Sequence, residues 1–186
     1  MQLVIPGAEH LSSYLAARRS GFQWGMQVSE EAMARHIAEV ESDPDKFLAG
    51  LQDLNPVGRT VTLPDGSEVP RLPQHTRWMW DGEFAGIITF RYQPGTNALP
   101  SHVLGHIGYA VVESKRRMGY ASQALTQMLA LPREMGLAYV EITTDVDNTA
   151  SQGVILKCGG TLVSQRPRPI AQGGEPLNYF VIQLQQ

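Results

Sequence analysis

The stretch ESKRRMGYASQAL, residues 113–125, joins a strand-like run to the start of a helix. The run before it, VLGHIGYAVV at 103–112, is apolar and predicts a strand. After Gly119, apolar residues recur at helical spacing and predict a helix. The first turn of a helix leaves backbone N–H groups unpaired and carries partial positive charge. The basic, glycine-bearing turn therefore predicts a cradle for a phosphate or pyrophosphate, although it also fits an exposed turn that binds nothing.

Two better-known phosphate loops are excluded here. No Lys-Ser or Lys-Thr pair follows Gly119, so the turn is not a nucleotide P-loop. The three-glycine spacing of a dinucleotide fingerprint is also absent.

The composition is that of an ordinary globular chain. Of 186 residues, 42% are hydrophobic and 18% charged, and we expect one domain over 1–186. The net charge of −3 gives no support for nucleic acid as the partner. The single cysteine, Cys158, excludes an internal disulfide and multi-cysteine zinc sites, so a cytoplasmic setting is expected. No leader peptide and no run of about 18 apolar residues is found, so we expect no membrane partner.

The rest of the chain mixes β and α patterns. Ser29 precedes two acids and an apolar stripe, which predicts a helix starting there, with Asp43-Pro44 as a candidate break in it. Asp65-Gly66 lies between two short β-type arms at 59–72, a two-residue hairpin signal, and the prolines in both arms restrict them to edge strands or an exposed flap. Other strands are expected at 2–6, 75–80, 84–92, 138–146, 161–166 and 177–184. Other helices are expected at 9–20 and from a cap at Asp147 or Asn148 to about Cys158. This order predicts an α+β domain around one sheet.

The motif Arg116-Arg117-Met118-Gly119-Tyr120-Ala121 resembles the Gln/Arg-x-x-Gly-x-Gly/Ala motif of the GNAT superfamily of N-acetyltransferases. EITTDVDN and ASQGVILKCGG follow in the order that the family shows, and the resemblance covers a core of about 76–165. More closely, the chain resembles a bacterial subgroup with no agreed substrate. The resemblance implies a mixed, mostly antiparallel twisted sheet of about six to seven strands, flanked by about four helices, with the hairpin near 59–72 as an addition.

The resemblance also implies acetyl-coenzyme A as the donor. Its pyrophosphate would bind the backbone amides of 117–121, and its pantetheine arm would pair with the strand that leads into the turn, like an added half-strand. Asn148 would hold the pantetheine through its amide. The coenzyme-binding residues implied are Tyr109, Ala110, Val111, Val112, Arg116, Arg117, Met118, Gly119, Tyr120, Ala121, Asn148 and Ser151.

Three side chains are candidates for the chemistry. Acetyl transfer needs a base for the amine and stabilisation of the departing thiolate. His106 stands where some relatives carry a glutamate and is the first candidate base, unless it is simply packed in the sheet. Glu141 could act through water, or be a surface acid. Ile155 occupies the position of the family's usual tyrosine acid, and Ser151 could instead hydrogen-bond the sulfur, unless it only bonds backbone.

The acceptor is less well defined. Trp24, Arg91, Tyr92 and Asp145 are candidates for its pocket, although each could be purely structural. The acidic balance slightly favours a cationic acceptor, such as a polyamine, an aminoglycoside-like amine or a peptide N-terminus. His102 and His106 would lie about 13 Å apart on one strand face, so we expect no metal site, and Cys158 is expected in the core. Exposed edge strands would permit a homodimer. The alternative function is a non-catalytic acyl-coenzyme A-binding module.

Overall fold

The computed structural model describes residues 1–25 and 28–184. Its strands form a four-stranded sheet, ordered β1-β4-β5-β6, and a three-stranded sheet, ordered β7-β9-β8. Neighbouring strands within each sheet are antiparallel. The strands are β1 (Gln2–Val4), β4 (Gln74–Trp80), β5 (Phe84–Arg91), β6 (Ile107–Val111), β7 (Tyr139–Asp145), β8 (Thr161–Pro167) and β9 (Pro176–Gln183).

The helices begin where the sequence offers caps. Ser29 Oγ accepts the N–H of Ala32 at the start of α2, and Asp43 both ends α2 and caps α3 through the N–H of Lys46. The helices are α1 (Leu11–Arg19), α2 (Glu30–Ser42), α3 (Pro44–Leu51), α4 (Tyr120–Met128), α5 (Ala130–Glu134) and α6 (Thr149–Lys157), with 3-10 turns η1 (Ala8–His10), η2 (Glu113–Lys115) and η3 (Ile170–Gln172).

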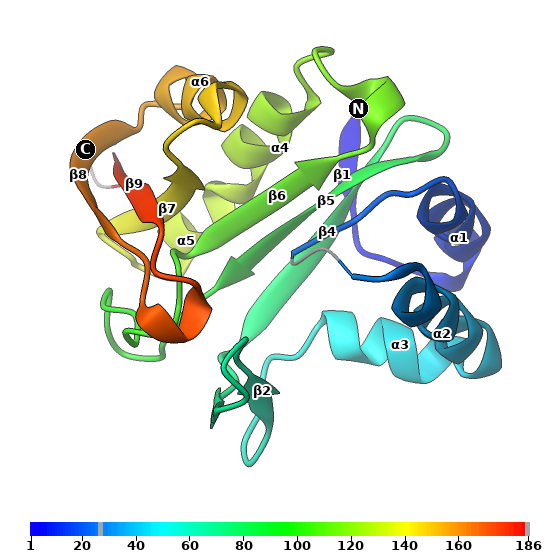
Figure 1. The fold of residues 1–186 in the computed structure, drawn as a ribbon. Coiled ribbons are helices and arrows are strands. Elements are labelled where there is room, and N and C mark those ends of the chain that lie inside the picture. Colours follow the sequence, from blue (N-terminus) through cyan, green and yellow to red (C-terminus); the bar gives the residue numbers. More distant parts are fainter. Residues whose placement is uncertain (26–27, 185–186) are drawn as a thin grey trace.

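Helices flank the four-stranded sheet on both sides (Figure 1). Helices α4 and α6 cover one face, and α1, α2 and α3 lie on the other side, against β4 and β5 (Figure 1). Alternation along the strands separates two cores. Ile88 and Ile142 pack with Leu125 beneath α4, whereas Trp78 and Ile87 pack with the N-terminal helices. The face of β5, β6, β7 and β9 that points away from α4 and α6 is called the opposite face below.

The two sheets meet at a narrow junction before β6. Gly105 forms an isolated bridge with Ile142 and has a φ of 89°. A Cβ at this position would lie 3.0 Å from the carbonyl oxygen of Glu141 and 3.2 Å from Cα of Ile142, so only glycine allows this approach. The predicted strand at 103–112 is therefore wrong at its start, because the left-handed Gly105 delays regular pairing with β5 until Ile107. His102 lies in a turn, so it does not share a strand face with His106.

The predicted hairpin is present as β2 (Thr60–Thr62) and β3 (Glu68–Pro70), which form a small sheet of their own. Its loop is longer than the Asp-Gly pair suggests. The N–H of Leu63 bonds the carbonyl of Ser67, and Gly66 has a φ of 84°, so three residues, 64–66, form the turn.

The predicted fold class, a mostly antiparallel α+β fold with flanking helices, is confirmed. The expected single sheet is instead two sheets, because among the described residues the isolated Gly105–Ile142 bridge is the only strand pairing at the junction of β6 and β7. Among the described residues, no helix combines the length and apolar character needed to cross a membrane.

Candidate active site

The turn before α4 presents a row of free backbone amides. Arg117 and Gly119 both adopt left-handed backbone angles, with φ of 62° and 78°. This conformation turns the chain sharply from β6 into α4. Within the described part of the chain, the N–H groups of residues 117–122 have no hydrogen-bond acceptor, and the first helical bond runs from the N–H of Gln123 to the carbonyl of Gly119. Residues 116–119 are exposed, so the turn can receive an anion from solvent.

A cluster of charged and polar side chains holds this turn in place. The hydroxyl of Tyr120 donates to Asp81 at 2.6 Å. The ammonium of Lys115 lies 3.0 Å from Asp81 and 2.7 Å from Glu83. The hydrogen bond from Tyr120 is the main cause that lowers the pKa of Asp81. The β4–β5 turn thus anchors the amide row, and Tyr120 has only its backbone free to meet a ligand.

The strand β6 has one unpaired edge. The N–H of Arg91 bonds the carbonyl of His106, and the N–H of Val112 bonds the carbonyl of Ala85. Both bonds involve even-numbered residues of 106–112. In an antiparallel ladder the backbone N–H and C=O groups of alternate residues point the same way, so those of the even-numbered residues of β6 point toward β5 and those of the odd-numbered residues point away from it. The backbone groups of Tyr109 and Val111 therefore face the gap between β6 and β7. Arg116 Nε lies 3.4 Å from the carbonyl of Val111 at this edge. Of the four strand positions predicted to pair with pantetheine, Ala110 and Val112 are already bonded to β5.

The first turn of α6 faces this gap from the other side. Asn148 Oδ1 accepts the N–H of Ser151 at 3.0 Å, so the Asn148 amide nitrogen stays available. The hydroxyls of Tyr109 and Ser151 are 2.9 Å apart. Burial raises the pKa of Tyr109 to about 12, so its phenol stays protonated at neutral pH. Ile155 is fully buried in the core and offers no polar group.

On the opposite face, two predicted acceptor residues converge on Gly108. A Cβ at Gly108 would lie 3.0 Å from Trp24 Cη2 and 3.3 Å from Arg91 Nη2. Tyr92 is not part of this group: it stacks on Phe90 at the other side of the strand, because consecutive strand residues point to opposite faces.

The acidic candidates lie on β7. Asp145 is paired with Arg168 at 2.6 Å. The half-buried Glu141 lies on the opposite face, and its carboxylate makes no ion pair or hydrogen bond with the described residues.

His106 is built into the junction of the two sheets. Its backbone N–H donates to the carbonyl of Glu141 at 2.7 Å, and its Nδ1 accepts the N–H of Glu141 at 2.9 Å. The side chain is fully buried, and burial lowers the pKa of His106 to about 4. Its Nδ1 lone pair is therefore occupied and its ring is out of reach of an incoming amine. This geometry argues against the prediction that His106 is the general base.

Cys158 is half-buried, and its Sγ lies 3.5 Å from the carbonyl of Ser122, as a packed thiol would. Across the described residues, no group of three or more His, Cys, Asp or Glu is arranged to hold a metal.

With this geometry in place, comparisons with known proteins can be set beside it. The family model described as an acetyltransferase (GNAT) domain matches residues 37–161. The chain belongs to the GNAT acetyltransferase family. No curated protein matches this GNAT chain in sequence.

Solved structures resemble this GNAT chain over nearly its full length. A ribosomal L7/L12 alpha-N-protein acetyltransferase in complex with coenzyme A has a TM-score of 0.60 at 18% identity, covering 98% of this chain and 94% of that one. A microcin C7 self-immunity acetyltransferase with acetyl-CoA and AMP gives 0.58 at 14%, covering 97% and 91%. A chimera of the Vibrio cholerae spermidine N-acetyltransferase gives 0.58 at 8%, covering 98% and 95%. At these identities the likeness concerns the fold.

Sequence reasoning missed two features of this site. The first is the Tyr109 hydroxyl, because the motif points only to the backbone of Tyr109. Tyr109 lies two residues from both Ile107 and Val111, so strand alternation places its side chain on the same face as theirs, toward α4 and α6. The role of Gly105 was also missed, because no sequence signal shows how closely a distant strand approaches a glycine.

Proposed function

We propose that this protein transfers an acetyl group from acetyl-coenzyme A to an amine by direct attack in a ternary complex. The observation that carries the proposal is the gap between β6 and β7, where the backbone groups of Tyr109 and the N–H of Val111 lead toward the unpaired amides before α4. An extended pantetheine arm would add to the β6 edge, and a pyrophosphate would accept from the amide row. The family membership supports this assignment.

The reaction would use the β6 edge at this gap, the hydroxyl pair at the start of α6 and the carboxylate of Glu141. The amine nitrogen forms a bond to the thioester carbonyl carbon, the carbon–sulfur bond breaks, and the products are an amide and the coenzyme A thiolate, which takes up a proton from solvent. The backbone N–H groups of β6 would polarise the carbonyl oxygen. Glu141 is our candidate to take the amine proton through water, since its carboxylate is uncommitted and lies on the opposite face.

The departing thiolate requires a hydrogen-bond donor. Ser151 and Tyr109 form a hydroxyl pair at the start of α6, beside the β6 edge. The pKa of Tyr109 is raised to about 12, whereas the reference pKa of a thiol is about 8.5. Proton transfer from the Tyr109 phenol to the thiolate is therefore unfavourable. We therefore assign this pair to hydrogen bonding rather than to full proton transfer.

The Glu141→Gln variant tests the catalytic part of the proposal. We expect thiol release from acetyl-coenzyme A, measured with a panel of amino acids, peptides, phosphoethanolamine and polyamines, to fall roughly 100-fold, because the base is lost. Affinity for acetyl-coenzyme A should stay unchanged. Glu134→Gln is the matched control, since Glu134 is exposed on α5.

Two outcomes would count against this reading. Full activity in Glu141→Gln would remove Glu141 from the mechanism. Tight binding of acetyl-coenzyme A with no thiol release in the parent would favour the alternative function, a non-catalytic acyl-coenzyme A-binding module. The specific observation behind this alternative is that Ile155 provides no hydroxyl where the family usually has a tyrosine acid.

A further inference from the structure

The guanidinium of Arg91 has no counter-ion in the part of the chain that the structure describes. No carboxylate of the described residues lies within salt-bridge distance of it, and its Nε is buried without a hydrogen-bond partner. Its side-chain hydrogen bond is a long one, 3.5 Å from Nη2 to Thr89 Oγ1. Arg71, the neighbouring charge that acts on Arg91, is also positive and is itself paired with Asp53. Arg91 as a whole is half-buried, but its Nε is buried and has no partner among the described residues. Leaving a permanently charged group in this state is costly, which indicates that its partner is a ligand.

Arg91 lies far from the amide row that is expected to bind the pyrophosphate. Arg91 Nη2 lies beside Gly108, at the start of β6, together with the ring of Trp24. The amide row lies beyond the other end of this strand, more than about 13 Å away at the usual rise per strand residue. A ligand at Arg91 is therefore not the coenzyme pyrophosphate, and it would sit where the acceptor must approach.

A second arginine adds positive charge to the same face. The guanidinium of Arg166, on β8, lies 3.9 Å from the centroid of the Tyr179 ring. Within the described ranges it makes no ion pair, whereas the neighbouring acid Asp145 is already paired with Arg168. Arg166 is exposed, and stacking on Tyr179 favours one orientation of its guanidinium, whose planar donor fork suits carboxylates and phosphates.

We propose that the acceptor carries an oxyanion, a carboxylate or a phosphate, near its amine, and that Arg91 binds this group, with Arg166 at the outer part of the same face. This inference rests on the proposed acetyl transfer. It also replaces the cationic acceptor that the net charge of −3 slightly favours, because uncommitted arginines on the opposite face outweigh the average charge of the surface. Glu141 then remains free to interact with the amine end of the same molecule.

The test measures binding of small acetylated probes to the protein loaded with coenzyme A, by saturation-transfer NMR. The probes are N-acetylglycine, N-acetylethanolamine phosphate, uncharged N-acetylethanolamine and cationic N-acetylputrescine, so the two anionic probes distinguish carboxylate from phosphate. We expect at least one anionic probe to bind and the other two to bind roughly tenfold more weakly or not at all, since a charge-assisted pair is lost. Arg91→Gln should weaken binding of the anionic probe by a similar factor, and Arg91→Lys should weaken it by less.

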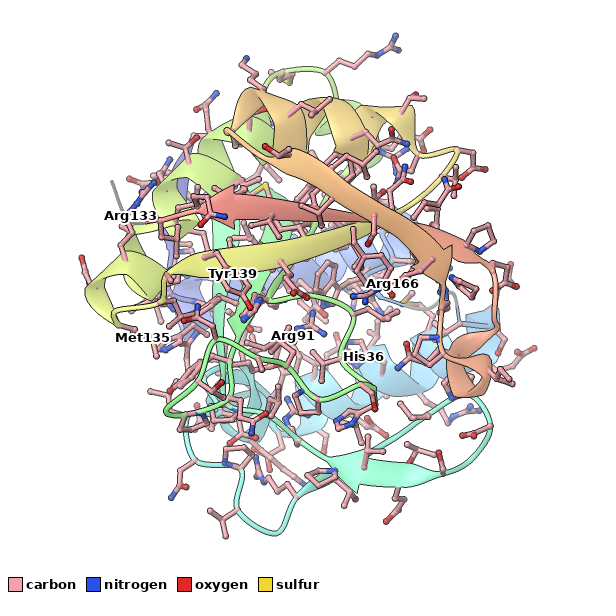
Figure 2. The ribbon with its side chains drawn as sticks, turned by 90° about the vertical axis from the view of Figure 1, so that its left-hand side faces the viewer. His36, Arg91, Arg133, Met135, Tyr139 and Arg166 are labelled. Carbon is pink, nitrogen blue, oxygen red and sulfur yellow. The ribbon has the colours of Figure 1, made fainter. Side chains whose placement is uncertain are left out.

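Controls keep the outcome interpretable. Arg133→Gln removes an exposed arginine on α5 that lies well apart from Arg91 and Arg166 (Figure 2), and should bind probes like the parent. Calorimetry with acetyl-coenzyme A on the same samples checks folding and the coenzyme site. If acetyl-coenzyme A fails to bind the parent, the proposed function fails. If it binds, the inference alone is overturned by equal binding of all probes, by binding of none, or by an Arg91→Gln variant that keeps its anionic probe.

Discussion

The Gly119→Asp variant is expected to lose roughly 100-fold in affinity for acetyl-coenzyme A while remaining folded. Gly119 has a φ of 78°, a backbone angle that an aspartate adopts only with strain. Relaxation of that strain would turn the amides of 117–122 away from the anion they are expected to bind. The new carboxylate would also repel the pyrophosphate at close range. Both effects act on the bound complex, so the measurement is a calorimetric titration.

Gly136→Asp provides a closely matched control for this variant. Gly136 follows α5, has a φ of 79°, and has nothing within 4 Å of the position of a Cβ. The substitution therefore introduces the same charge and the same backbone strain away from the amide row. We expect this variant to bind acetyl-coenzyme A like the parent. An equal loss in both variants, or no loss in Gly119→Asp, would show that the turn is not the coenzyme cradle.

The second large effect is expected in the acid stability of the protein. The pKa of His106 is about 4 in the folded state, against an ordinary value of 6.5. Between these two pH values the unfolded chain binds the proton and the folded protein does not, so stability rises with pH across this range. Full stabilisation is present above pH 6.5 and is lost as the pH falls toward 4. A shift of this size corresponds to about 3 kcal/mol of unfolding free energy.

The His106→Asn variant isolates this contribution. Asn Oδ1 can still accept the N–H of Glu141 that His106 Nδ1 accepts, but it cannot be protonated. We expect the variant to be less stable at neutral pH by about 1–3 kcal/mol because of the smaller side chain. Its unfolding free energy, measured with denaturant, should lose the part of the pH 4–6.5 slope due to His106. The lowered pKa values of His36 and His75 leave a residual slope in both proteins. An unchanged slope would show that His106 is accessible to protons in the folded state.

Local patterns predicted the scaffold well. The caps at Ser29 and Asn148 and the glycine turn before α4 depend on neighbouring residues, so they can be recognised in the sequence. The face occupied by Arg91 also follows from alternation, which places Tyr92 on the other side. Arg91 and Tyr92 are consecutive at the end of a strand, so their side chains point to opposite faces and cannot line one pocket.

The features that could not be predicted depend on contacts between distant segments. The role of His106 changes because Glu141, on another strand, bonds both its backbone and its ring. That approach requires Gly105, whose neighbours lie on β7. That Arg91 has no counter-ion among residues 1–25 and 28–184 likewise cannot be read from the sequence, because it depends on which acids the fold brings near and which it pairs elsewhere.

Calorimetric titration of the intact protein with acetyl-coenzyme A at neutral pH tests the central claim most directly. If the gap between β6 and β7 and the amides before α4 form one coenzyme site, binding should saturate at one molecule per chain with micromolar affinity, a free energy of about −8 kcal/mol. The absence of saturable binding would contradict the account, because the free β6 edge and the amide row would then have no coenzyme to bind.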